Sequence, residues 1–135
     1  WPNDLQLHGK KVSGALCETI FENDGVWVFL GIGLNVNMED ADLKKIDQPA
    51  TSLKMETGKT WDLAALKQKL QRQIALDLEL FKKEGFKPFH DKIEKLLAYL
   101  GKKITCFDGK KNWIGICHSL GPDGELNLKM APDKL

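Results

Sequence analysis

A long amphipathic segment in the middle of the chain constrains the fold more than any other feature. From about Trp61 onward, apolar residues recur at spacings of three and four, which places them on one face of a helix. They are Leu63, Leu66, Leu70, Ile74, Leu78 and Phe81. Asp62 lies in the first turn, Lys82 and Lys83 lie in the last turn, and Gly85 follows, as the helix dipole and a C-terminal glycine favour. The sequence therefore predicts one long helix here.

The region before this helix is typical of short strands separated by turns. His8-Gly9 and Asn23-Asp24-Gly25 are turn signals, and they predict strands at about 5–7, 11–21 and 26–35. The third strand is apolar almost throughout, so we expect it to be covered on both faces and central to a sheet. After a polar stretch, Pro49 to Glu56 suits a short helix with Thr51 or Ser52 near its start.

Beyond the long helix, the apolar period changes. A second helix is predicted from about Pro88 to Leu100, with Gly101 at its end. From there to the last residues the apolar spacing is two, and turn signals stand at Gly109 and at 122–124. This pattern predicts a β module of three or four strands, and at roughly 35 residues such a module needs to pack on the helices.

Size and charge exclude several classes of protein. The 135 residues suffice for one ordinary domain or two small ones. With 20 Lys and Arg against 19 Asp and Glu, the net charge of +1 gives no field that would attract nucleic acid or an acidic membrane. The longest apolar stretch, Val26 to Leu34, is too short to span a bilayer as a helix. We therefore expect neither nucleic-acid binding by this segment nor membrane insertion.

The cysteines and the first residues indicate the setting of the chain. Cys17, Cys106 and Cys117 are widely spaced and odd in number, which fits neither a disulfide framework nor a metal site. We expect buried thiols in a reducing, cytoplasmic compartment. Because the chain begins Trp1-Pro2 without a methionine, we also expect it to start within a longer protein.

Three apparent motifs lack a residue or a spacing that their function requires. Gly58-Lys59-Thr60 resembles the end of a phosphate-binding loop, but the glycine that the motif requires five residues earlier is Leu53. Gly31-Ile32-Gly33 lacks the third glycine of a dinucleotide fingerprint, since that position is Val36. The three histidines are far apart and lack zinc-protease spacing, so no metal ligand is predicted.

Polar residues embedded in the strand region remain to be explained. Asp4 precedes an apolar strand, Lys11 lies beside glycines, and Asn35 closes the most apolar strand. Glycines allow a ligand to approach the backbone, and an asparagine amide has the donor and acceptor needed to read an edge such as that of adenine. Each residue also has a structural interpretation: a turn carboxylate, a solvated lysine and a strand-end cap.

Taken together and in this order, the segments resemble the signature of the biotin protein ligase family. The matching positions are Trp1-Pro2-Asn3-Asp4, then Lys11 and Gly14, then Gly31-Ile32-Gly33-Leu34-Asn35. Ala50-Thr51-Ser52-Leu53 is similar to the next helix of that family. The resemblance implies an α+β fold, with a mixed-sheet fragment of a class II synthetase-like catalytic domain and a helix pair over residues 1–100. A small SH3-like barrel would follow over residues 101–135.

The resemblance also implies a two-step reaction. Biotin and ATP, with Mg²⁺, would give biotinyl-5′-adenylate, and the biotinyl group would pass to a lysine of the biotin carboxyl carrier protein of acetyl-CoA carboxylase. Lys11 would meet the phosphate and the biotin carboxyl group, Asp4 would receive the incoming lysine, and Asn35 would read adenine. The remaining implied binding residues are Asn3, Gly14, Ala15, Leu16, Gly31 and Gly33.

The front of the family pattern has no counterpart in these residues. Neither the loop rich in glycine and arginine that closes over the adenylate nor the upstream biotin-binding residues occur here, so we expect the chain to be the C-terminal part of a ligase that is inactive alone. A different class of function stays open, in which the chain is a non-catalytic fragment or a module that docks the carrier domain. A homodimer is also left open.

Overall fold

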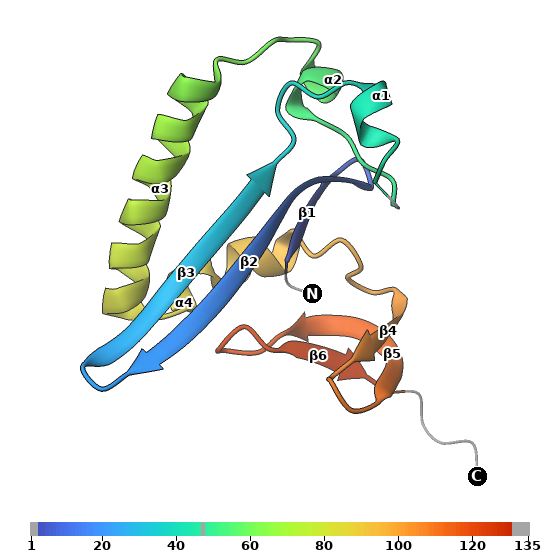
Figure 1. Cartoon of the computed structure of the whole chain (residues 1–135). Helices are drawn as coiled ribbons and strands as arrows, with labels where there is room; N and C mark the ends of the chain where they lie inside the picture. Colours follow the sequence, from blue (N-terminus) through green and yellow to red (C-terminus); the bar gives the residue numbers. More distant parts are fainter. Residues whose placement is uncertain (1–2, 47, 131–135) are drawn as a thin grey trace. The chain divides into compact units, whose positions relative to one another are not determined.

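The computed structural model describes residues 3–46 and 48–130 and is shown in Figure 1. The chain divides into two compact units, one reaching to Lys69 and the other beginning at Leu70. The point of division lies inside a helix. The predicted domain boundary after residue 100 stays a prediction.

The first unit is built on a three-stranded antiparallel sheet. Its strands are β1 (Asp4–Leu7), β2 (Lys10–Glu22) and β3 (Gly25–Leu34), in the order β1-β2-β3. His8 and Gly9 form the first turn with φ values of 50° and 75°, the left-handed conformation that a tight turn requires. The three predicted strands are thus confirmed to within a few residues.

The predicted position of the apolar third strand is wrong. Among the described strands, β2 is the central one and β3 lies at the edge of the sheet beside β2 (Figure 1). Large side chains of β3 stay exposed, including Trp27 at 57% and Val28 at 62%. An apolar run indicates that both faces of a strand need to be covered. It does not indicate whether the described residues provide that cover.

Two short helices follow the sheet. The polar stretch contains α1 (Asp40–Leu43), which the sequence did not predict and which Glu39 and Asp42 cap reciprocally. α2 (Leu53–Thr57) is confirmed in place but begins later than predicted, since the Ser52 side chain accepts from the Met55 N–H as its N-cap. Gly58 ends α2 at φ 69°, which explains this glycine without a phosphate-binding loop.

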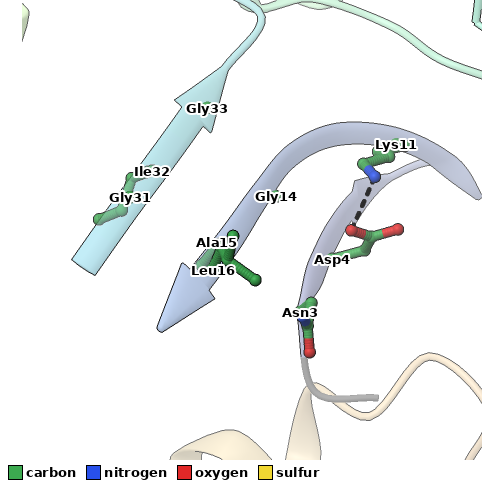
Figure 2. A pocket seen from close by; sticks show the side chains of 9 residues that line it. All are labelled: Asn3, Asp4, Lys11, Gly14, Ala15, Leu16, Gly31, Ile32 and Gly33. Atoms are coloured by element: carbon green, nitrogen blue, oxygen red, sulfur yellow. Dashed lines mark ion pairs between the residues drawn. The ribbon is translucent and has the colours of Figure 1, made fainter. Parts of the chain in front are cut away.

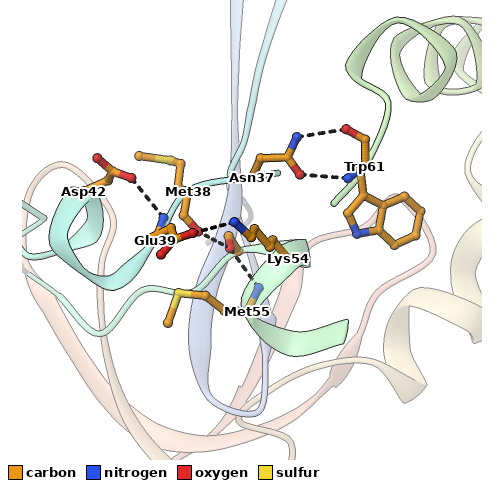
Figure 3. Close-up of polar contacts among 8 residues, drawn as sticks. Asn37, Met38, Glu39, Asp42, Lys54, Met55 and Trp61 are labelled. Atoms are coloured by element: carbon orange, nitrogen blue, oxygen red, sulfur yellow. Dashed lines mark hydrogen bonds and ion pairs between the residues drawn. The ribbon is translucent and has the colours of Figure 1, made fainter. Parts of the chain in front are cut away.

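The predicted long helix is confirmed as α3 (Leu63–Glu84). The Asp62 carboxylate accepts from the backbone N–H groups of Ala64 and Ala65, and Gly85 ends the helix at φ 67°. The Asn37 amide ties the segment just before α3 to the segment that follows β3. This amide donates to the Trp61 carbonyl at 2.8 Å and accepts from the Trp61 N–H at 2.9 Å (Figure 3).

The second unit contains α4 (Lys87–Lys95) and a second antiparallel sheet. The sheet has the order β4-β5-β6, with β4 (Lys103–Phe107), β5 (Asn112–Leu120) and β6 (Leu126–Lys129), which confirms the predicted β module. α4 ends before Leu100, contrary to prediction, because the chain turns with the Leu96 N–H donating to the Ile93 carbonyl. The freed Leu97 packs instead with Cys117 and Leu120 in the core of this unit.

Two further expectations are corrected. The expected mixed sheet is not found, because every strand pair is antiparallel and the parallel contact recorded among the described residues is the bridge between Lys11 and Ala50. Of the three cysteines, Cys117 is buried, whereas Cys17 is exposed. No helix within the described ranges has the length and apolarity to cross a membrane.

Candidate functional site

An open cleft of about 530 Å³ lies over the sheet of the first unit. All the residues predicted for the site except Asn35 line it, and Ile32 joins them (Figure 2). The lining is Asn3, Asp4, Lys11, Gly14, Ala15, Leu16, Gly31, Ile32 and Gly33. Segments that are far apart in the sequence are therefore brought together by the pairing of three strands.

Asn35 lines a second, smaller cleft beside the first. This cleft of about 280 Å³ shares Lys11, Gly14 and Gly33 with the larger one. Its other lining residues are Ser13, Asn35 and Ile46. The two clefts thus adjoin at Lys11 and the glycines, which would allow one elongated ligand to occupy both.

An irregularity in the sheet directs Lys11 into the cleft. Asp4 pairs with Gly14, but two residues later Gln6 pairs with Lys11, so β2 carries one extra residue between these pairs. Residues that pair across strands share a face, so Lys11 lies on the same face as Asp4 and Gly14. In a regular strand, residues 11 and 14 would point to opposite faces. This β-bulge is therefore what adds a lysine to the cleft.

Lys11 and Asp4 form an ion pair inside the cleft. The Lys11 Nζ lies 2.8 Å from the Asp4 Oδ1, and Figure 2 shows the two side chains pointing toward each other. The side chains are 28% and 37% exposed, so solvent and ligands reach both. A pair this exposed contributes little to stability, and an anionic ligand could compete for the lysine.

The glycines keep the cleft open. A Cβ at Gly14 would lie 3.2 Å from the Asp4 Oδ1 and 3.4 Å from the Lys11 Cε, so a side chain there would crowd the ion pair. A Cβ at Gly33 would meet the Gly14 carbonyl oxygen at 3.9 Å, an ordinary contact, and would project over the cleft floor. The floor beside Lys11 is consequently bare backbone, which a flat or extended ligand can approach closely.

Asn35 is held by backbone and side-chain bonds. Its N–H donates to the Val12 carbonyl, and its side-chain Nδ2 donates to the Thr51 carbonyl at 3.0 Å. The amide therefore has a structural partner, as the strand-end interpretation expected, but this bond uses only one of its two N–H groups. The other N–H and the Oδ1 are the groups through which it would read a ligand.

Sequence reasoning missed three lining residues: Ser13, Ile32 and Ile46. Ile32 and Ser13 stand next to glycines that the motif singled out, which was the available signal. The Ser13 hydroxyl donates to the Gly33 carbonyl at 2.8 Å and so joins β2 to β3 beneath the site. Ile46 carries no such signal. Trp1 and Pro2, the first two motif residues, lie outside the described residues.

Comparisons with known proteins agree with the motif. The model of the biotin/lipoate A/B protein ligase family matches residues 1–35. The bifunctional ligase/repressor BirA of Escherichia coli is 32% identical over 130 residues, which are 96% of this chain and 40% of that protein. The biotin--[acetyl-CoA-carboxylase] ligase of Paracoccus denitrificans is 30% identical over 133 residues, 96% of this chain and 55% of that protein.

The fold agrees as well. The solved structure of the biotin protein ligase from Aquifex aeolicus in complex with biotin and ATP superposes with a TM-score of 0.81 at 35% identity. The match covers 95% of this chain and 53% of that one, so the chain spans about half the length of that ligase. Sequence motif, curated relatives and fold therefore lead to one conclusion: the chain belongs to the biotin protein ligase family.

Proposed function

We propose that this chain carries part of the active site of a biotin protein ligase, which forms biotinyl-5′-adenylate and transfers biotin to a lysine of a biotin carboxyl carrier protein. The observation that carries the proposal is the convergence of the Asp4–Lys11 ion pair with a floor of bare glycine backbone in one cleft. A lysine and a carboxylate in contact supply the two charges that the two half-reactions require.

In the first half-reaction, a carboxylate oxygen of biotin attacks the α-phosphorus of ATP. An oxygen–phosphorus bond forms, the bond to the β-phosphate oxygen breaks, and pyrophosphate leaves. Two anionic groups must approach each other, so a cation placed between them lowers the barrier. Lys11 has that role here, because the bulge directs its ammonium group into the cleft.

In the second half-reaction, the amine of the carrier lysine attacks the acyl carbon of the adenylate, an amide forms, and AMP leaves. The incoming ammonium must first lose a proton, which a nearby carboxylate can accept. Asp4 is paired with Lys11 in the structure. When Lys11 turns to the phosphate, the Asp4 carboxylate becomes available to the carrier lysine.

The other lining residues shape the pocket. Asn35 reads the adenine edge from the smaller cleft, and Asn3 supports the adenylate region. Gly14, Ala15 and Leu16 with Gly31 and Gly33 form one wall for biotin and adenylate. Leu16 is 58% exposed at this wall, so apolar surface is offered to the ligand.

Mg²⁺ is the expected companion of ATP, and the part of the chain that the structure describes holds no dedicated cage for it. Among the described residues, no group of three or more His, Cys, Asp or Glu side chains could hold a metal ion. Mg²⁺ at nucleotide sites is often held by substrate phosphates, water and one or two carboxylates. Mg²⁺ bound with ATP would add to the charge compensation that Lys11 supplies.

The proposed domains, partner and compartment rest on membership of the family. The catalytic part would be related to class II synthetases over residues 1–100, and the sheet of the second unit would belong to an SH3-like domain over 101–135. The partner would be the carrier protein of acetyl-CoA carboxylase, in the cytoplasm, with homodimerisation open and no nucleic acid bound by this segment. The alternative is a non-catalytic fragment or carrier-docking module, which the openness of the cleft favours.

Pyrophosphate release in the presence of biotin and ATP tests the proposal. In the full-length protein that contains this chain, Lys11→Met should slow release by roughly 10²-fold or more, because a charge-stabilising group is removed. Lys10→Met is the matched control, since Lys10 is the exposed neighbour of Lys11 on β2 and lines neither cleft. Equal rates for the two variants would contradict the role of Lys11.

The 135-residue chain alone should release no pyrophosphate above a control without enzyme. An adenylate forms where water is excluded, whereas this cleft is open and its wall residues are exposed. Biotin-dependent release by the isolated chain would overturn this part of the proposal.

A further inference from the structure

Two completely buried side chains lie next to the clefts and are both polar. Thr51 and Ser52 are 0% exposed, although serine and threonine usually lie at the surface. Ser52 is explained by local structure, because its hydroxyl caps α2 and donates to the Met38 carbonyl at 2.6 Å. Thr51 is not a cap, so its burial requires another account.

The backbone of Thr51 connects Lys11 and Asn35, two polar residues of the clefts. Its N–H donates to the Lys11 carbonyl at 2.8 Å, and its carbonyl accepts from the Asn35 Nδ2 at 3.0 Å. The Lys11 N–H in turn donates to the Pro49 carbonyl at 2.8 Å. Lys11 is thereby fixed at both of its backbone polar groups by the segment that ends in Thr51.

The side chain of Thr51 is anchored by Glu56 of α2. Its hydroxyl donates to the Glu56 Oε1 at 2.6 Å, and the second oxygen of that carboxylate contacts the His8 Nδ1. The bond from Thr51 and then the bond from His8 lower the pKa of Glu56, so the carboxylate is held as the charged acceptor. Glu56 thus joins α2 to the turn between β1 and β2, and the same carboxylate holds the Thr51 side chain.

The bond between Thr51 and Asn35 also determines how the amide is oriented. A carbonyl oxygen only accepts, so the NH₂ end of the amide must face Thr51, and the amide cannot rotate by half a turn without losing the bond. With one N–H so used, the remaining N–H and the Oδ1 form the donor and acceptor pair that faces a ligand. An amide in the opposite orientation would present the wrong pattern to adenine.

We propose that Thr51, anchored by Glu56, is a positioning residue that orients the Asn35 amide and so determines affinity for the adenine nucleotide. The inference rests on the proposed function, because it gives Asn35 the role of adenine reader. Thr51 itself does not line either cleft, so it acts only through its neighbours.

The test compares variants of the full-length protein that contains this chain. Thr51→Val removes the hydroxyl at nearly constant volume, and Thr51→Ser retains it. Thr57→Val is the matched control, because that hydroxyl lies at the end of α2 and belongs to a separate set of bonds: it donates to the Leu53 carbonyl and accepts from the Lys59 N–H and the Trp61 Nε1. The measured quantities are the KM values for ATP and for biotin in pyrophosphate release, together with hydrogen exchange of the Asn35 side-chain amide by NMR.

Thr51→Val should raise the KM for ATP roughly fivefold, as expected for one lost hydrogen bond, and leave the KM for biotin within about twofold. Exchange of the Asn35 amide should accelerate, while that of Asn37, which bonds Trp61 instead, should not change. Thr51→Ser and Thr57→Val should behave like the unmodified protein. Asn35→Ala combined with Thr51→Val should be no worse for ATP than Asn35→Ala alone.

Equal losses for ATP and biotin, additive losses with Asn35→Ala, or unchanged Asn35 exchange in Thr51→Val would each overturn the positioning role. These results differ from a failure of the proposed function. A protein that shows no ATP-dependent turnover but faster Asn35 exchange in Thr51→Val would contradict the ligase activity and support the orientation of the amide by Thr51.

Discussion

Single residues decide what the cleft can do, and one extra residue in β2 has the largest effect. The bulge between the Asp4–Gly14 and Gln6–Lys11 pairs turns Lys11 to the face that carries Asp4. Gly14 then leaves the space in which the two charges meet. The chemistry proposed here therefore depends on a backbone irregularity as much as on the side chains themselves.

Asn35→Ala tests the adenine contact. In the full-length protein that contains this chain, the change should weaken ATP binding by about 0.5 to 3 kcal/mol and leave biotin affinity nearly unchanged, because one amide edge is lost. Titration calorimetry with each ligand measures both values. Asn127→Ala, which removes an exposed amide from β6, is the control. Equal losses for ATP and biotin would show that Asn35 acts only through its bond to Thr51.

Asp4→Asn separates the two half-reactions. The amide cannot accept the proton of the carrier lysine, so biotin transfer should slow by roughly 10²-fold or more while adenylate formation is less affected. Single-turnover kinetics with and without carrier protein distinguish the two steps. Normal transfer from preformed adenylate, combined with a collapse of adenylate formation, would assign Asp4 to the first step instead.

Much of this site was predictable from the sequence, but only through the motif. The spacing of Asp4, Lys11, Gly14 and Asn35 identified the residues, and the structure brings them around two adjoining clefts. The bond from Asn35 to Thr51 was not predictable, because it joins the end of a strand to a segment sixteen residues further along. Local patterns carry no information on such contacts.

At the scale of elements, periodicity predicted well where one face repeats over many residues. α3 was found almost as expected because its spacing and both of its ends gave signals. α1 was missed because its four residues are too few to show a period. α4 was predicted too long because Leu96 and Leu97 continue the apolar spacing of the helix. The chain has already turned at these residues, and Leu97 packs in the core of the second unit.

The contacts between α4 and β5 predict that the stability of the second unit depends on pH. The His90 Nδ1 lies 3.0 Å from the Asp91 Oδ1, and its Nε2 lies 3.3 Å from the Leu120 carbonyl oxygen, so the doubly protonated ring donates to both. The Asp91 bond first and the Leu120 bond second raise the pKa of His90 above its ordinary value of 6.5. The Glu94 carboxylate accepts from the Leu120 N–H at 2.8 Å and also favours the charged ring.

Because the pKa of His90 is raised in the folded protein, the charged ring stabilises the fold fully below pH 6.5. This stabilisation is lost as the pH rises through the folded-state pKa of His90. Asp91 has a lowered pKa, so its own contribution is lost only in acid, below its ordinary 3.8. His90→Asn should therefore destabilise the protein at pH 5.5 and much less at pH 8, as measured by urea unfolding. His118→Asn, on the exposed side of β5, is the control, and a loss independent of pH would contradict the charged ring.

For the whole molecule, the hairpin of β2 and β3 is the most consequential feature. Apolar side chains lie exposed along both strands, with Phe21 at 78% and Trp27 at 57%. Contiguous apolar surface of this kind marks a contact region or promotes association. The 135-residue chain on its own should therefore self-associate.

Sedimentation velocity over a range of concentrations checks this expectation. Val28→Lys places a charge in the middle of the hairpin and should shift the 135-residue chain toward the monomer. Leu96→Lys, at an exposed position of the second unit, should leave the association unchanged. A monomer at all concentrations, or equal effects of the two variants, would contradict association through the hairpin.

Transfer of labelled biotin to a carrier protein measures whether the Asp4–Lys11 cleft belongs to a working biotin ligase. The full-length protein that contains this chain should label a biotin carboxyl carrier domain in the presence of biotin and ATP, should not label a carrier whose acceptor lysine is replaced by arginine, and should lose roughly 10²-fold or more of the rate with Lys11→Met. No incorporation under conditions in which the Paracoccus denitrificans ligase labels the same carrier, or full activity of Lys11→Met, would contradict the account.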